Sequence, residues 1–148
     1  MVTKLWGAIK KESRGLVWNE SQMTTGFPEI DAQHKKWIAM FNQFENAIIN
    51  QRGEEICPDA ILFFVRYTET HFRDEETLME LHHCSAQYTN KMDHEKFKSR
   101  LQEFTYMTWP LGATANDVFS LRNELVEWMR NHICTIDVKL RDVVKKPG

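Results

Sequence analysis

The segment HFRDEETLM, residues 71–79, indicates that this chain is helical and that its buried helix faces carry polar groups. It continues an apolar stripe that keeps helical spacing for about five turns. Ionisable side chains enter the stripe only at His71 and Glu75, which are four residues apart and therefore point the same way. A buried carboxylate must be paired or bound to a cation, and the alternative here is a salt bridge between helices. The stripe consists of Ile61, Phe64, Val65, Thr68, His71, Phe72, Glu75, Leu78 and Met79.

The ends of the first two helical segments are marked by proline and by a capping residue. We expect the first helix to begin after TGFPEIDAQ, where Pro28 excludes an earlier start and Asp31 can act as its cap, and to continue to about Asn50. We expect the second helix to have Pro58 at its first position. Asp74 and Glu76 lie off the second stripe and are interpreted as a solvated acidic face. The first stripe consists of His34, Trp37, Ile38, Phe41 and Ile48.

Two further segments repeat the pattern. The third runs from about Tyr88 to Met107, and the fourth opens near Thr114 or Asn116. The third stripe consists of Asn90, His94, Phe97, Leu101 and Phe104, and the fourth of Val118, Leu121, Leu125, Trp128, His132, Ile136 and Leu140.

Four amphipathic segments without strand-like alternation predict an all-α fold, an antiparallel up-down four-helix bundle. Residues 28–148 form this single-domain bundle in the prediction, and residues 1–27 form an N-terminal arm that packs on it. The arm is expected to lie across the bundle through Trp6, Leu16, Val17 and Trp18.

Composition excludes several classes of protein. The chain has 148 residues, 27% of them charged, a formal net charge of −2 and no run of like charge, which argues against nucleic-acid or membrane-surface binding. No apolar stretch approaches the length of a transmembrane helix or resembles a secretory signal, so we expect a cytoplasmic protein. Its three cysteines, Cys57, Cys84 and Cys134, have no CxxC pairing and are interpreted as free thiols.

Each of the four stripes carries one histidine: His34, His71, His94 and His132. One buried histidine is usually structural, but four facing one bundle interior are most simply explained by a metal bound inside it. Imidazole and carboxylate without thiolate suit iron or manganese and are tolerated by zinc or copper, so the ligand types leave the metal open. Asp137 lies about 140° from His132 around an ideal helix, and spacing alone does not select it.

Four stretches of this chain resemble motifs of the hemerythrin family, specifically of its bacterial single-domain members. TGFPEIDAQHKKW resembles the first-helix signature, and HFRDEETLM resembles the His-Phe-x-x-Glu-Glu-x-x-Met element. DHEKF is similar to the end of the His-x-x-x-His-x-x-Phe element, and HICTID to the final His-Ile-x-x-x-Asp element. The resemblance covers about residues 18–140, in order and with similar spacing.

The resemblance implies two non-haem irons inside the bundle, bridged by two carboxylates and an oxo or hydroxo group; manganese or a single metal is the alternative. It implies that His34 and His71 bind one iron, that His94 and His132 bind the other, and that Glu75 and Asp137 are the bridging carboxylates. It also implies an apolar pocket for dioxygen, lined by Trp37, Phe72, Trp128, Met129 and Ile133.

The chain departs from the family pattern at Asn90, where a histidine four residues before His94 is usual. Asn90 is therefore predicted to be a weak or lost ligand, which leaves an additional exchangeable position on one metal. Cys84 and Ser85 also stand where the family has tyrosine and proline, so the turn before the third helix has changed. His82 and His83 are candidates to replace the missing ligand, and the alternative is that both are exposed turn residues.

Three functions remain open from the sequence. The resemblance favours a dioxygen-binding protein for carriage, storage, delivery or sensing. The open position at Asn90 favours a di-metal redox enzyme with oxidase-like, peroxidase-like or nitric oxide chemistry. The third alternative is a degenerate bundle that binds one metal or none and acts as a sensor or interaction module. The expected partner is dioxygen or another small diatomic ligand, and the sequence indicates no protein partner.

Overall fold

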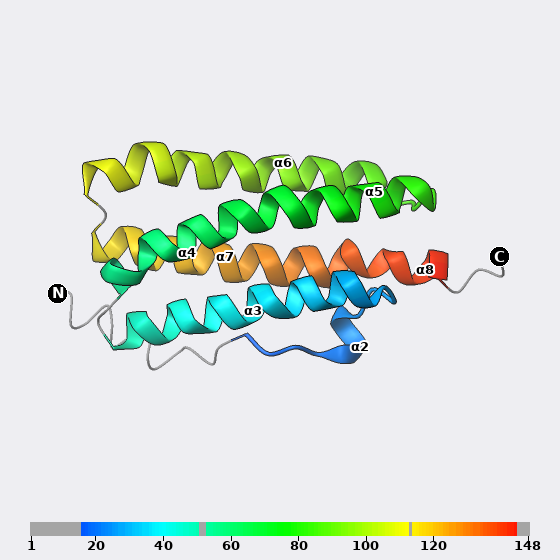
Figure 1. Ribbon diagram of the computed structural model, residues 1–148, viewed down its shortest axis with the longest axis horizontal. Coiled ribbons are helices and arrows are strands. Elements are labelled where there is room, and N and C mark those ends of the chain that lie inside the picture. The colour runs from blue at the N-terminus through cyan, green and yellow to red at the C-terminus, as the bar shows by residue number, and fades with distance from the viewer. Residues whose placement is uncertain (1–15, 51–52, 113, 145–148) are drawn as a thin grey trace.

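The computed structural model describes residues 16–50, 53–112 and 114–144, without the side chains of residues 47–49, 53–58 and 109. Trp6 and the side chains of Ile48 and Cys57 lie outside this description. Long helical rods lie side by side and alternate in direction along the chain (Figure 1). They are α3 (Pro28–Ile49), α4 (Gly53–Tyr67) continued by α5 (Arg73–Leu81), α6 (Gln87–Glu103), and α7 (Ala115–Thr135) continued by α8 (Leu140–Val144). The predicted up-down four-helix bundle is confirmed, and the described residues contain no strand.

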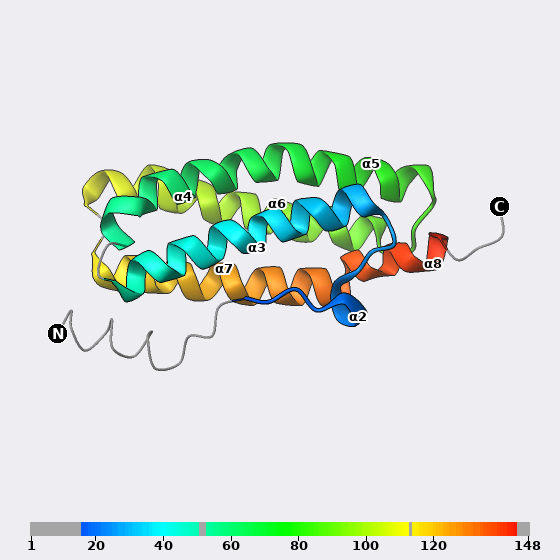
Figure 2. The ribbon, with the colours of Figure 1, turned by 60° about the horizontal axis from the view of Figure 1, so that its bottom comes forward.

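The segment before α3 lies on the outside of the bundle and contains the short helix α2 (Glu20–Met23), which contacts α7 (Figure 2). Leu16 is buried in the core, and its backbone N–H and C=O both bond to the amide of Asn42 in α3, at 2.8 and 2.9 Å. Trp18 is partly buried against the same core. Val17 was expected to pack on the bundle but is 72% exposed, because successive residues of an extended segment point to opposite sides.

Two predicted helix starts differ from the structure. Pro28 is the first residue of α3, where its fixed φ and missing N–H are tolerated, so Asp31 lies inside the helix and does not cap it. The carboxylate of Asp31 instead accepts hydrogen bonds from the Thr24 hydroxyl and from the Thr25 hydroxyl and backbone N–H, at 2.7 to 2.9 Å, and so holds the preceding loop. Helix α4 begins at Gly53, so Pro58 is not its first residue. Pro58 is the sixth residue of α4, and its missing N–H removes the one bond to the carbonyl of Glu54 in the first turn.

Helix α7 begins as predicted and ends in a way that the sequence did not indicate. Thr114 caps it reciprocally with Asp117, in a capping box. Regular α-helix stops at Thr135, Ile136 has φ −109° and ψ −59°, and a 3₁₀ turn (Asp137–Lys139) follows before α8. π-helical turns occur at Thr68–Phe72, between α4 and α5, and at Phe104–Thr108, after α6.

Apolar side chains from all four rods fill the bundle interior. The predicted stripes are buried at most of their positions, whereas Val65, Leu78, Trp128 and Ile136 are half-buried. None of the helices in the described part of the chain is long and apolar enough to cross a membrane. The largest fully buried side chains are Trp37, Phe41, Phe44, Phe64, Phe72, Phe104, Ile30, Met79, Leu121 and Leu125.

Candidate metal centre

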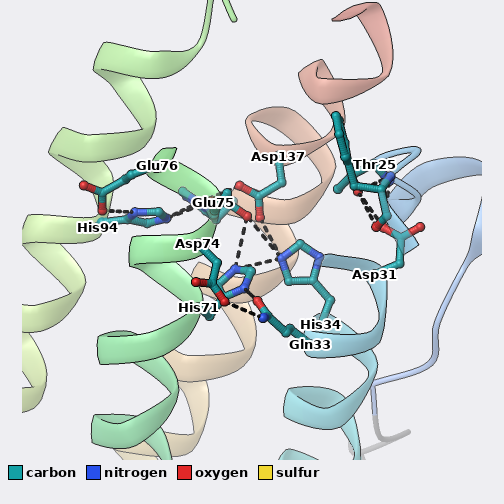
Figure 3. Close-up of polar contacts among 12 residues, drawn as sticks. Thr25, Asp31, Gln33, His34, His71, Asp74, Glu75, Glu76, His94 and Asp137 are labelled. Atoms are coloured by element: carbon teal, nitrogen blue, oxygen red, sulfur yellow. Dashed lines mark hydrogen bonds and ion pairs between the residues drawn. The ribbon is translucent and has the colours of Figure 1, made fainter. Parts of the chain in front are cut away.

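Six ionisable side chains from the four rods meet in the bundle interior, and each is at most 2% exposed. Figure 3 shows Glu75 and Asp137 directed into the space between the helices that carry His34, His71 and His94. We refer to His34 and His71 as the first histidine pair, and to His94 and His132 as the second histidine pair. Every predicted ligand except Asn90 thus reaches one cluster, in which each pair lies with Glu75 and Asp137 in a group whose ligand atoms are within 4.8 Å of one another.

The first histidine pair faces one oxygen of each carboxylate. The two Nε2 atoms of this pair are 3.1 Å apart. Glu75 Oε2 lies 3.1 Å from His71 Nε2 and 3.5 Å from His34 Nε2. Asp137 Oδ2 lies 3.0 Å from His34 Nε2.

The second histidine pair faces the other oxygen of each carboxylate. Its Nε2 atoms are also 3.1 Å apart. Glu75 Oε1 lies 3.0 Å from His94 Nε2 and 3.5 Å from His132 Nε2, and Asp137 Oδ1 lies 2.9 Å from His132 Nε2. Glu75 and Asp137 therefore each present one oxygen to each pair, which is the arrangement of two carboxylates that bridge two cations.

The break after α7 explains how Asp137 reaches this place. On an uninterrupted helix it would lie about 140° from His132. Because regular helix ends at Thr135 and the chain tightens into a 3₁₀ turn from Asp137, the carboxylate lies beside the imidazole of His132 instead. Spacing failed here because it assumed a continuous helix.

Three imidazoles are held at their outer nitrogen by side chains that the sequence analysis did not assign to the site. His71 Nδ1 lies 2.6 Å from the amide oxygen of Gln33, whose Nε2 donates to Asp74 at 2.9 Å. His94 Nδ1 lies 2.9 Å from Glu76 Oε2. The interpretation of Asp74 and Glu76 as a solvated acidic face is therefore wrong, because both accept hydrogen bonds in the interfaces between helices.

The third imidazole with an outer partner is that of His132, whose Nδ1 lies 2.6 Å from Asp93 Oδ2. The fourth, that of His34, differs from these three. His34 Nδ1 is buried without a hydrogen-bond partner.

Gln33, Glu76 and Asp93 each adjoin one of the six clustered residues in sequence. A residue next to an inward-facing one lies about 100° around the helix, where it meets the neighbouring helix, and this adjacency is a signal that could have identified them.

The inner nitrogen and oxygen atoms of the cluster offer lone pairs and face no hydrogen-bond donors that would match them. An imidazole whose Nδ1–H donates to an oxygen carries, when neutral, a bare lone pair on Nε2. In His71, His94 and His132 the Nδ1 atom lies against a side-chain oxygen, so the Nε2 lone pair of each ring, once any proton there is lost, points at the carboxylates. None of the four oxygens of Glu75 and Asp137 has a hydrogen-bond partner of acceptable geometry, although all are buried. Converging imidazole and carboxylate lone pairs require cations, so these residues fit a pair of metal ions.

The electrostatics of these side chains lead to the same conclusion. Burial disfavours the imidazolium form of His34, but close contact with Asp137 and Glu75 outweighs it and raises the pKa of His34 to about 9. Burial acts in the same direction on His132, and the charge of Asp137 nevertheless raises its pKa well above the usual value. Burial alone would raise the pKa of Glu75, but the surrounding imidazoles, His71 foremost, hold it well below its usual range. The site therefore attracts positive charge, and a metal ion must displace protons to bind there.

Asn90 is the buried residue whose amide the protein does not satisfy. It is 0% exposed, and both its Oδ1 and its Nδ2 lack a hydrogen-bond partner. It lies one turn before His94 on the regular helix α6, so the two side chains project from the same face. His82 and His83 are exposed at the end of α5 and are absent from both ligand groups. The structure therefore offers no replacement ligand from this turn.

Aromatic side chains cover the second histidine pair. The ring of Phe72 stacks on that of His94, with centroids 3.6 Å apart and an angle of 3°, and Trp128 stacks on His132 at 4.4 Å and 12°. Trp37, Met129 and Ile133, the other expected pocket residues, are buried in the same core. Tyr67, which the sequence analysis did not single out, stacks on His71 at 4.6 Å, and its hydroxyl is buried without a partner.

Comparison with known proteins agrees with this geometry. The model of the hemerythrin HHE cation binding domain matches residues 25–142. The chain belongs to the hemerythrin family. Bacteriohemerythrin of Pseudomonas aeruginosa is 34% identical over 132 residues, which cover 88% of this chain and 82% of that relative. Bacteriohemerythrin of Stenotrophomonas maltophilia is 33% identical over 133 residues, with the same coverage. No solved structure gave a significant match.

Membership of the hemerythrin family accounts for a cation site in the bundle. The family match extends from α3 through the 3₁₀ turn that follows α7, and these elements carry all six clustered side chains. Cys84 and Cys134 are free thiols in the described structure, as expected. Among the described residues, this buried cluster of imidazoles and carboxylates, without a thiolate, is the group that could hold metal ions.

Proposed function

We propose that this hemerythrin-family protein holds two non-haem irons in the bundle and binds dioxygen, or another small diatomic ligand, at that centre. One observation carries the proposal: Glu75 and Asp137 each present one oxygen to the first histidine pair and the other oxygen to the second. The names of the relatives and the cation-binding domain support the same assignment. Two bound irons would supply the electrons and the open coordination position that a diatomic ligand requires.

The protein side chains would prepare this centre in three ways. The two histidine pairs supply nitrogen lone pairs, and those of His71, His94 and His132 are fixed in direction by stacking and by their Nδ1 contacts. Glu75 and Asp137 supply two negative charges that compensate part of the metal charge. The apolar side chains of Phe72, Trp128 and their neighbours limit the access of water, which favours a neutral ligand such as dioxygen over charged competitors.

A specific observation favours a second function, a di-metal redox enzyme. Asn90 stands one turn before His94, and its amide binds no other group of the protein. A position with a weak amide ligand or water would be exchangeable, and exchangeable positions on two adjacent metals allow a substrate to bridge them and react. Oxidase-like, peroxidase-like and nitric oxide chemistry belong to this alternative.

One experiment separates these functions. The purified protein is loaded with Fe²⁺ without oxygen, its metal content is measured, and its absorption spectrum is followed on exposure to air and after removal of oxygen. Binding of dioxygen predicts two irons per chain, a new visible band in air, and return of the starting spectrum on deoxygenation. Steady consumption of dioxygen or peroxide with an added reductant would favour the enzyme. A protein that binds far fewer than two metals would contradict both functions and favour an interaction module.

A further inference from the structure

The two halves of the metal centre have matching inner ligands but different outer contacts. Each half has two Nε2 atoms and one oxygen from each shared carboxylate. In the second histidine pair, both outer nitrogens face carboxylates, Asp93 at 2.6 Å and Glu76 at 2.9 Å. In the first pair, one outer nitrogen faces the neutral amide of Gln33, and that of His34 has no partner.

Carboxylate contacts change the quality of an imidazole ligand. A carboxylate that accepts the Nδ1 proton fixes the tautomer, orients the ring and makes Nε2 a stronger donor to a metal. It also adds a negative charge close to the ion. The side chains of Asp93 and Glu76 are each 27% exposed, so both carboxylates reach water while they hold the rings. An amide such as that of Gln33 orients a ring without adding charge.

Stacking adds to the same difference between the halves. The His94 ring lies flat against Phe72, and the His132 ring lies flat against Trp128. Each ring of the second pair therefore has an aromatic ring on its face and a carboxylate at its Nδ1 edge. In the first pair, Tyr67 stacks on His71, whereas His34 meets the edge of His71 and has a free Nδ1. The second pair is therefore the more completely oriented of the two.

Asn90 lies in the half that is better oriented and more negative. From α6 it projects on the same face as His94, and so toward the second histidine pair. We infer that Asp93 and Glu76 are positioning residues that compensate for the imidazole absent at position 90 and retain the metal of the second pair. This inference rests on the proposed function, because it assumes that both halves bind a metal. It predicts that this chain holds two metals with only two imidazoles in each half.

The test removes the two outer charges and keeps the shapes of the side chains. Asp93→Asn and Glu76→Gln are made singly and together, and the matched controls Glu95→Gln and Glu80→Gln remove the same charge at exposed positions nearby on α6 and α5. Metals per chain are counted by native mass spectrometry after anaerobic loading with Fe²⁺, and the two dissociation constants are measured by competition with a chelator. Circular dichroism verifies the fold of each variant. We expect the double variant to lose about 10–100-fold in affinity for one metal, and the controls to keep both.

A rescue experiment shows which half is affected. Asn90→His, added to the Asp93→Asn/Glu76→Gln background, supplies a third imidazole to the second pair and is expected to restore the lost affinity. The same Asn90→His should not repair Gln33→Leu, which removes the outer contact of His71 in the first pair. A purely structural role of Asp93 and Glu76 would not be repaired by an imidazole at position 90.

The outcomes distinguish this inference from the proposed function. If the unmodified protein binds two metals and the double variant binds both equally well, the compensation by Asp93 and Glu76 is overturned and the metal centre stands. Equal weakening of both metals, or failure of Asn90→His to restore affinity, also overturns it. If the unmodified protein binds no metal, the proposed function itself fails.

Discussion

Two glutamates are buried almost equally deeply in this bundle, but only one of them is paired with a cationic side chain. Glu45 is 2% exposed and accepts hydrogen bonds from the guanidinium of Arg122 at 3.1 and 3.2 Å. Glu75 is 0% exposed, and neither of its oxygens has a hydrogen-bond partner of acceptable geometry. The neighbours of Glu75 are imidazoles and the carboxylate of Asp137, and none of them is a permanent cation.

The difference shows how a fold separates stability from binding. Around Glu45 the chain supplies the positive charge itself, so that region is complete when the protein folds. Around Glu75 the chain supplies lone pairs and negative charge, and it leaves the positive charge to protons or to metal ions. A buried carboxylate without a fixed protein cation is thus a stronger indication of a binding site than a buried carboxylate as such.

The largest expected effect comes from Glu75→Gln. The amide has one acceptor oxygen where the carboxylate has two, so it cannot bridge both histidine pairs, and it removes a negative charge that both metals share. We expect affinity for metal to fall by more than the roughly 100-fold that is the upper range for changes outside the ligands themselves. Metal analysis after loading with Fe²⁺ measures this. Retention of two metals would mean that Glu75 is not a shared ligand.

Glu45→Gln is the matched substitution in the other region and should give the opposite pattern. It leaves the guanidinium of Arg122 partly buried, at 18% exposure of its side chain, without its carboxylate. We expect the free energy of unfolding to fall by about 1–3 kcal/mol, because a charged hydrogen-bonded pair is broken. Metal content should remain that of the unmodified protein. Urea denaturation and metal analysis test both parts, and loss of metal here would show that the two regions are coupled.

The sequence predicted the bundle because its stripes are long and strongly periodic, and such patterns survive small errors at helix ends. It missed the start of α3 at Pro28 and that of α4 at Gly53, because a proline is compatible both with the first position and with the first turns of a helix. Neither error moved an inward-facing residue, because both helix starts precede the first residue of the predicted stripe and leave its spacing unchanged.

The candidate site was predictable only in part from this chain's own residues. The histidines and Glu75 follow from helical spacing, but Asp137 needed the resemblance, because the break at Ile136 has no evident signal in the sequence. Gln33, Glu76 and Asp93 each adjoin a clustered residue in sequence, which could have marked them as candidates. Which imidazole each one holds could not be predicted, because that imidazole lies on a neighbouring helix and depends on a packing angle that one sequence does not provide. That these six side chains bind metal remains a prediction.

The smallest expected effect concerns two asparagines and should differ in sign between them. Asn90 buries an amide that has no partner, whereas Asn42 bonds the backbone of Leu16 through both its oxygen and its nitrogen. Replacement by leucine, which branches at the same carbon, should stabilise the metal-free protein by about 1–2 kcal/mol at position 90, because burial of an unsatisfied amide is costly.

The same replacement at position 42 should destabilise the protein by a similar amount, because it leaves the N–H and C=O of Leu16 without their partners. Urea denaturation in the presence of a chelator measures both changes in the metal-free state. If Asn90→Leu is as destabilising as Asn42→Leu, the amide of Asn90 has a partner in the folded protein and is not available to bind a metal. Opposite signs would mean that the chain gives up stability at position 90, as expected of a residue placed at a binding site.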